Sequence, residues 1–141
     1  MMNTLSNAEI VQSFLDALAN KDIATATQLL AADLRYTNVS LPTITGSEQV
    51  IKLFTLLAKA GMGFEVKTHH IATQGHVVMT ERTDILSFKN FKVSFWVCGT
   101  FEVKNGQISV WRDHFDWFDM SKGAAIGLLG IVWPAYRATL K

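Results

Sequence analysis

The chain has 141 residues, of which 49% are hydrophobic and 18% are charged, and its formal net charge at pH 7 is +1. This length suits one domain with a sizeable core, so we expect residues 1–141 to form a single domain. The charge balance offers no basic stripe to nucleic acid. The single cysteine excludes an internal disulfide and a thiolate cage for a metal.

We expect no membrane span, because the longest uncharged stretch, 123–136, is shorter than the about 20 residues that cross a bilayer. The first ten residues lack the basic and apolar segments of a secretory signal, which predicts a cytoplasmic protein. Charged residues are scarcer than the about 25% of ordinary soluble domains. Part of the surface is therefore expected to be a pocket wall or a subunit contact.

The first third of the chain predicts three helices. Ser6 and Glu9 match the capping-box pattern that begins a helix, and an apolar stripe at helical spacing follows them. Asp22 is a candidate cap for a short second helix that ends near Ala31. A third helix is predicted between Ser47 and Gly61.

Strands are predicted at 33–40 and then in succession at 64–73, 76–88, 91–103 and 107–118. Helices followed by an antiparallel meander indicate the α+β class, with the helices covering one face of the sheet. The apolar, glycine-rich tail from Ser121 is compatible with a helix. The turn at Asn105 and Gly106 is predicted to be a three-residue loop that sets Asp113 opposite Val97, because this register keeps the apolar faces of the two strands together.

Asp113 interrupts an apolar strand face on which Trp111, Phe115 and Trp117 are predicted to lie. A buried carboxylate needs a partner. Arg82 and Asp84 are two residues apart on a strand, so their side chains point to one side and could supply it. Tyr36 and Asn38 likewise share a strand face and can hold a small polar molecule such as water.

Two carboxyl groups and one arginine in a dry pocket suit acid–base chemistry. Burial and like charge keep one carboxyl protonated, while the guanidinium keeps the other ionised. The pair titrates as a unit, so the residues alone do not say which is the acid. A protonated acid facing an ionised base suits the addition of water to a strained, uncharged electrophile such as an epoxide.

These segments resemble the motifs of the limonene epoxide hydrolase family. They are Tyr36-x-Asn38 followed by Leu41-Pro42, Glu81-Arg82-x-Asp84, and Trp111-Arg112-Asp113, in the order and with the spacing typical of that family. The resemblance extends from about Ser6 to Phe118. It implies a curved, mostly antiparallel sheet wrapped around a pocket and covered by the N-terminal helices, the cone-like fold of nuclear transport factor 2 and ketosteroid isomerase.

The resemblance also implies roles. Asp84 would be the general acid, Asp113 the general base and Arg82 the bridge between them. Tyr36 and Asn38 would hold the water. The substrate wall would consist of four apolar residues, namely Leu86, Phe95, Val97 and Trp111. The expected enzyme hydrolyses small apolar cyclic epoxides to vicinal diols without cofactor or metal, and it is expected to be a homodimer.

Two other readings stay open. One is a proton-transfer enzyme like ketosteroid isomerase or a polyketide cyclase, in which a carboxylate removes a carbon-bound proton. The pairing of Arg82 with Asp84 argues against it, because an arginine between two carboxyl groups suits water activation better. The other is a non-catalytic module for ligand binding or dimerisation, which predicts an empty or filled-in pocket in which Asp113 is merely neutralised. A metal at His69 and His70 is not expected, because neighbouring strand residues point to opposite faces.

Overall fold

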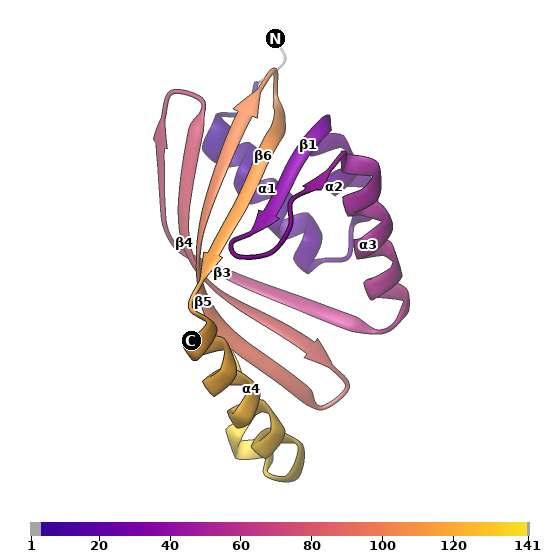
Figure 1. The fold of residues 1–141 in the computed structure, drawn as a ribbon, viewed down its shortest axis with the longest axis vertical. Helices are drawn as coiled ribbons and strands as arrows, with labels where there is room; N and C mark the ends of the chain where they lie inside the picture. Colours follow the sequence, from indigo (N-terminus) through magenta and orange to yellow (C-terminus); the bar gives the residue numbers. More distant parts are fainter. Residues whose placement is uncertain (1–3, 141) are drawn as a thin grey trace.

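The computed structural model describes residues 4–140, which form a curved six-stranded sheet with helices on its concave face and at one end (Figure 1). The elements, in chain order, are α1 (Asn7–Ala19), α2 (Ile23–Leu29), β1 (Leu30–Asn38), β2 (Ile44–Thr45), α3 (Ser47–Lys59), β3 (Met62–Gln74), β4 (Val77–Phe88), β5 (Phe91–Lys104), β6 (Gln107–Phe115), α4 (Trp117–Val132) and the 3-10 turn η1 (Pro134–Tyr136). The α+β class is confirmed.

The starts of α1 and α2 follow the predicted caps. Ser6 accepts a hydrogen bond from the backbone N–H of Glu9, whose side chain accepts one from Ser6 N–H in return. Asp22 caps α2 through the N–H of Thr25, although α2 ends at Leu29 and the chain passes directly into β1. Because α2 is so short, β1 begins earlier than the sequence predicted.

The strand order is β2-β1-β6-β5-β4-β3. Four of the five pairings are antiparallel, and β1 pairs with β6 in parallel. This parallel pairing sets Tyr36 beside Trp111 and Asn38 beside Asp113. Residues about 75 positions apart in the chain therefore become neighbours on one face of the sheet.

The predicted register between β5 and β6 is wrong. The turn is a two-residue loop in which Asn105 and Gly106 both have positive φ, as a type I′ turn requires. A bulge at Ser109 then adds one residue to β6, and Asp113 pairs with Gly99 instead of Val97. The bulge keeps the apolar faces together, so the side of the sheet predicted for Asp113 is nevertheless the observed one.

The last strand also ends earlier than predicted. Asp116 leaves the strand and accepts a hydrogen bond from the N–H of Phe118, which begins α4. Trp117 and Phe118 are therefore helical, and Trp117 is not part of the inward strand face. Helix α4 packs along β5 through Gly123 and Gly127, where an added Cβ would run into the carbonyl oxygens of Ser94 and Lys92.

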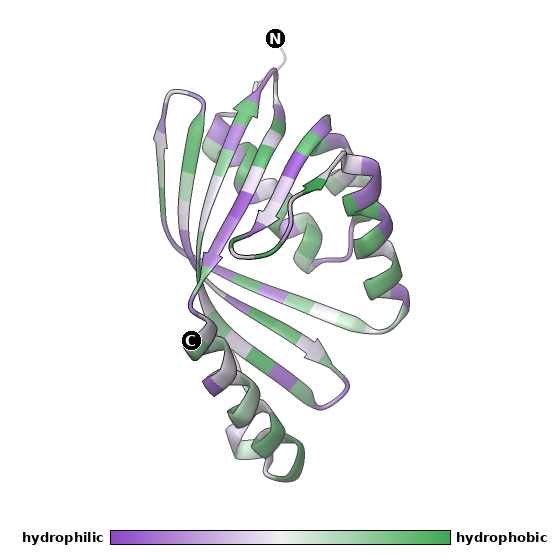
Figure 2. Ribbon diagram, viewed as in Figure 1, coloured by the Kyte–Doolittle hydropathy of each residue, from purple (hydrophilic) through white to green (hydrophobic). Residues whose placement is uncertain are grey.

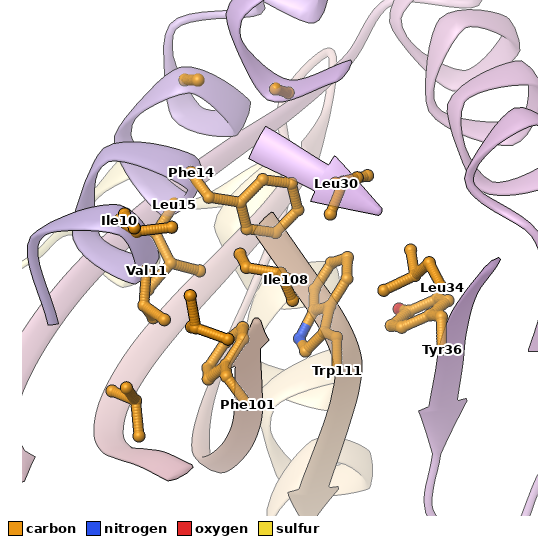
Figure 3. Close-up of a cluster of buried hydrophobic side chains, with 14 of the residues drawn as sticks. Ile10, Val11, Phe14, Leu15, Leu30, Leu34, Tyr36, Phe101, Ile108 and Trp111 are labelled. Carbon is orange, nitrogen blue, oxygen red and sulfur yellow. The ribbon is translucent and has the colours of Figure 1, made fainter. Parts of the chain in front are cut away.

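The hydrophobic core lies between the sheet and helices α1 to α3. Apolar and polar residues alternate along the strands, as expected for a sheet with one covered face, whereas α4 is apolar over most of its length (Figure 2). Trp111 is at the centre of this core, between Phe101 on one side and Tyr36 on the other (Figure 3). Within residues 4–140, no helix is both long enough and apolar enough to cross a membrane.

Candidate active site

Strand β4 positions an arginine and a carboxylate on the covered face of the sheet. Thr80, Arg82 and Asp84 alternate along β4, so all three side chains point inward. The guanidinium of Arg82 is completely buried, and it donates from Nε and Nη2 to the two carboxylate oxygens of Asp84 at 3.1 and 2.9 Å. Buried charge of this kind is stable only where it is fully paired.

Arg82 also reaches the second carboxylate by lying across β5. Its Nη1 and Nη2 donate to Oδ1 and Oδ2 of Asp113 on β6, at 3.3 and 3.0 Å. Nη1 donates in addition to Thr80 Oγ1 at 3.2 Å, so every N–H of the guanidinium has an acceptor. The two carboxyl groups thus flank one cation.

Gly99 makes this crossing possible, although it was not among the residues predicted from the sequence. It lies on β5 between Thr80 of β4 and Asp113 of β6, and the guanidinium occupies the place of a side chain there. An isolated glycine in a predicted strand is the signal that could have revealed it, because such glycines often mark a close approach. Thr80 was also missed, since a threonine in a strand carries no such signal.

Strand β1 brings two further polar groups to the same place. Asn38 donates from Nδ2 to the phenol oxygen of Tyr36 at 2.9 Å. Within residues 4–140, the phenol proton of Tyr36 and the amide oxygen of Asn38 have no protein partner. One donor and one acceptor beside Asp113 are therefore available to a small molecule such as water.

A cavity of about 620 Å³ opens over this cluster. Asp84, Asp113, Tyr36 and Asn38 are among the lining residues, and most of the remaining wall is apolar. That apolar part comprises Leu18, Ile23, Leu41, Pro42, Ile44, Leu53, Phe54, Leu57, Ala58, Met62, Gly63, Phe64, Leu86, Phe95, Trp111, Phe115 and Met120. The cavity thus combines an apolar wall with a small polar floor, as small-molecule sites commonly do.

The structure brings together all five residues predicted to carry the chemistry: Tyr36, Asn38, Arg82, Asp84 and Asp113. Three of the four predicted wall residues, Leu86, Phe95 and Trp111, line the cavity. Val97 does not line it. It is buried on the same face of β5, one step beyond Phe95 and beside Arg82.

The electrostatics differ between the members of the cluster. Burial raises the pKa of Asp84 above its ordinary value, although the nearby Arg82 opposes the shift. Burial alone would lower the pKa of Arg82, but Asp113 and Asp84 raise it, so the guanidinium stays charged. Burial, together with the charge of Asp113, raises the pKa of Tyr36, and the phenol keeps its proton. The cluster therefore retains a proton on a carboxyl more readily than water-exposed aspartates would.

Within residues 4–140, no three His, Cys, Asp or Glu side chains lie close enough together to bind a metal ion. His69 instead forms a hydrogen bond with Thr83 at 2.8 Å, and His76 forms one with Glu102 at 3.1 Å.

Comparison with known proteins identifies the family of this chain. Residues 5–125 match the limonene-1,2-epoxide hydrolase catalytic domain, which is most of the chain. This chain belongs to the limonene-1,2-epoxide hydrolase family. As a member of that family it is an epoxide hydrolase, and this decides among the classes of function that the sequence left open.

Individual relatives agree with this assignment. The epoxide hydrolase EphG of Mycobacterium tuberculosis is 45% identical over 130 residues, covering 92% of this chain and 87% of that protein. A solved structure of a limonene-epoxide-hydrolase-like epoxide hydrolase from M. tuberculosis superposes with a TM-score of 0.92 at 44% identity, covering 95% of each chain. A nuclear transport factor 2-like protein from Burkholderia pseudomallei K96243 shares the fold, with a TM-score of 0.72 at 18% identity over 85% of this chain and 98% of that one.

Proposed function

We propose that this enzyme adds water in one step to small apolar cyclic epoxides and releases vicinal diols, without cofactor or metal. The observation that carries the proposal is the double pairing of Arg82. Its guanidinium contacts both oxygens of Asp84 and both oxygens of Asp113, and both carboxyl groups face the cavity. One buried cation between two carboxyl groups favours a state in which one is ionised and the other protonated.

Asp113 is the proposed general base. A water held by Tyr36, Asn38 and Asp113 gives a proton to the Asp113 carboxylate while its oxygen attacks an epoxide carbon. The positions of these groups support this role. Asn38 pairs with Asp113 between the parallel strands β1 and β6, and the amide oxygen of Asn38 and the phenol proton of Tyr36 lie on the same side of the sheet.

Asp84 is the proposed general acid. As the C–O bond of the epoxide breaks, the ring oxygen takes the proton of the Asp84 carboxyl and becomes the second hydroxyl of the diol. The raised pKa of Asp84, caused chiefly by burial, keeps that proton available. The product carries one oxygen from water, and the cycle ends when a proton passes from Asp113 back to Asp84.

The apolar wall would orient the ring of the substrate. Leu86, Phe95 and Trp111 are the proposed contacts, because they line the cavity next to the two carboxyl groups. Val97 does not line the cavity, and its proposed role is to pack beside Arg82.

Single-turnover hydrolysis in isotopically labelled water tests the proposal. Enzyme in excess is mixed with cyclohexene oxide or limonene oxide, and the diol is analysed by mass spectrometry. One labelled oxygen in the diol on the first turnover is the expected result. An unlabelled diol on the first turnover, with label appearing in an aspartate side chain, would indicate a covalent intermediate and overturn the mechanism. Failure to open either epoxide would contradict the substrate class.

We also propose that the enzyme is a homodimer. Several large apolar side chains of α4 and its continuation are exposed, among them Phe118, Val132 and Trp133. Light scattering after size-exclusion chromatography measures the mass in solution. A mass of twice the chain supports the dimer, and the mass of one chain contradicts it.

A further inference from the structure

The two carboxyl groups of the candidate site are held almost symmetrically by Arg82. Each accepts two hydrogen bonds from the guanidinium: Asp84 at 3.1 and 2.9 Å, and Asp113 at 3.3 and 3.0 Å. Both are nearly buried. Arginine by itself therefore gives little reason for one carboxyl group to be the base and the other to be the acid.

Trp111 breaks this symmetry. Its indole Nε1 donates to Oδ1 of Asp113 at 2.9 Å, whereas Asp84 accepts no hydrogen bond beyond those of Arg82 among the described residues. A third donor favours the ionised form of the group that accepts it. The contact also distinguishes the two oxygens of Asp113, because Oδ1 then accepts two hydrogen bonds and Oδ2 only one.

The direction of this indole N–H is held by packing. Trp111 is 4% exposed, and its ring centroid lies 5.0 Å from that of Phe14 in a T-shaped arrangement with an interplanar angle of 82°. The indole centroid lies 4.1 Å from the ring centroid of Tyr36 and 5.7 Å from that of Phe54. The indole plane is within 12° of the plane of the Phe101 ring. Four packed rings and near-complete burial leave the indole little freedom to turn its N–H away from Asp113.

We infer that Trp111 is a positioning residue that assigns the two roles: its N–H keeps Asp113 ionised as the base, leaves Oδ2 as the oxygen that accepts the proton from water, and so leaves the shared proton on Asp84. The inference rests on the proposed function of the two carboxyl groups. It gives Trp111 a role beyond the apolar wall that the sequence predicted.

The surroundings of Asp113 supply few competing charges. Arg82 and Asp84 face it from β4, and Tyr36 faces it from β1. Strand β5 presents Gly99 at this level, which has no side chain. The helices contribute aromatic rings around the indole, and the cavity also contains Lys21 of the turn between α1 and α2.

The test replaces Trp111 by phenylalanine, which keeps a ring and removes the N–H. The location of the shared proton is read by NMR of isotope-labelled aspartate side chains in the resting enzyme, with D84N and D113N used to assign the two signals. The pH profile of kcat on cyclohexene oxide is measured alongside. F14L is the matched control, because it changes one of the four rings packed against the indole while the N–H and the other three rings remain.

In the wild type we expect the proton on Asp84 at neutral pH. In W111F the proton moves towards Asp113, the acidic limb of the kcat profile moves up by about one pH unit, and kcat at neutral pH falls about tenfold. In F14L the shared proton should stay on Asp84, and the acidic limb of the kcat profile should keep its wild-type position. If W111F does not fold, benzothienylalanine at position 111 carries the test, since it preserves the shape and lacks only the N–H.

An unchanged proton location and an unchanged acidic limb in the folded variant would overturn the inference alone. A wild-type enzyme with the proton on Asp113 would overturn the inference together with the proposed roles of the two aspartates. An active D113N enzyme would instead remove the proposed function and the inference with it.

Discussion

Gly99 lies directly beneath the guanidinium of Arg82. A Cβ added to Gly99 would come within 2.5 Å of Nη1 of Arg82 and within 2.9 Å of Oδ1 of Asp113. The absence of a side chain at one strand position therefore lets a cation on β4 reach a carboxylate on β6.

Replacing Gly99 by alanine should displace the guanidinium. We expect kcat to fall about 100-fold, because a small misplacement of a reacting group is costly, and the free energy of unfolding to fall by about 1–3 kcal/mol from overpacking. Steady-state kinetics and urea denaturation measure the two effects. T100A, which alters the opposite face of the same strand, is the control, and wild-type turnover by G99A would contradict the prediction.

Replacing Asp113 by asparagine should leave the fold intact and lower kcat by about 10²–10⁴-fold, the usual contribution of a general base. The amide oxygen still accepts from Trp111 and Arg82, but it cannot take a proton from water. Circular dichroism and epoxide turnover are the measurements. D33N carries the same change at an exposed position of β1 and should keep full activity. Substantial hydrolysis by D113N would argue against its role.

Replacing Arg82 by lysine should impair stability as well as activity. A lysine ammonium keeps the charge but cannot donate to both oxygens of two carboxyl groups, so Asp84 and Asp113 lose partners in a buried site. We expect the free energy of unfolding to fall by about 3 kcal/mol. R35K, at an exposed position of β1, is the matched control. An R82K protein as stable as the wild type would show that the double pairing contributes little.

The pH dependence of stability should report on Asp84. Burial raises the pKa of Asp84 above its ordinary value of 3.8, so the folded chain holds this proton more tightly than the unfolded chain. Its contribution is most favourable below pH 3.8 and is lost as the pH rises through the window between 3.8 and the higher folded value.

D84N has no such proton. Measured by urea denaturation across pH, the wild type should therefore lose stability relative to D84N as the pH rises through that window, and the difference should level off above it. A difference between the two proteins that stays constant, or that grows in favour of the wild type with rising pH, would be incompatible with a raised pKa.

The alternation of residues along a strand explains why the polar cluster was predictable. Arg82 and Asp84 are two positions apart, and so are Tyr36 and Asn38, so each pair shares a face in any strand. Asp113 was conspicuous because its neighbours on the same face are apolar. These local rules hold even where the register between strands is wrong by two residues.

The register and the strand ends depend on contacts that a sequence does not display. The bulge at Ser109 interrupts the backbone pairing of β5 and β6 and brings the two apolar faces together, and the Ser109 hydroxyl donates to the carbonyl oxygen of Glu102 at 3.3 Å. The end of β6 at Phe115 depends on Asp116 capping a helix that the sequence placed four residues later. The hydrogen bond from Trp111 to Asp113 needs the packed aromatic rings around it, which come from several elements.

The position of α4 has a consequence for the behaviour of the chain in solution. Beyond Phe115 β6 no longer pairs with β5, so among residues 4–140 the first half of β5 has a strand partner only on its β4 side. On the other edge, Asp119 of α4 accepts a hydrogen bond from the N–H of Trp96 at 3.0 Å. Helix α4 thus occupies an edge that would otherwise present unpaired backbone groups to other molecules. A chain shortened before α4 would keep every residue of the catalytic cluster and yet be prone to aggregate through intermolecular β-pairing.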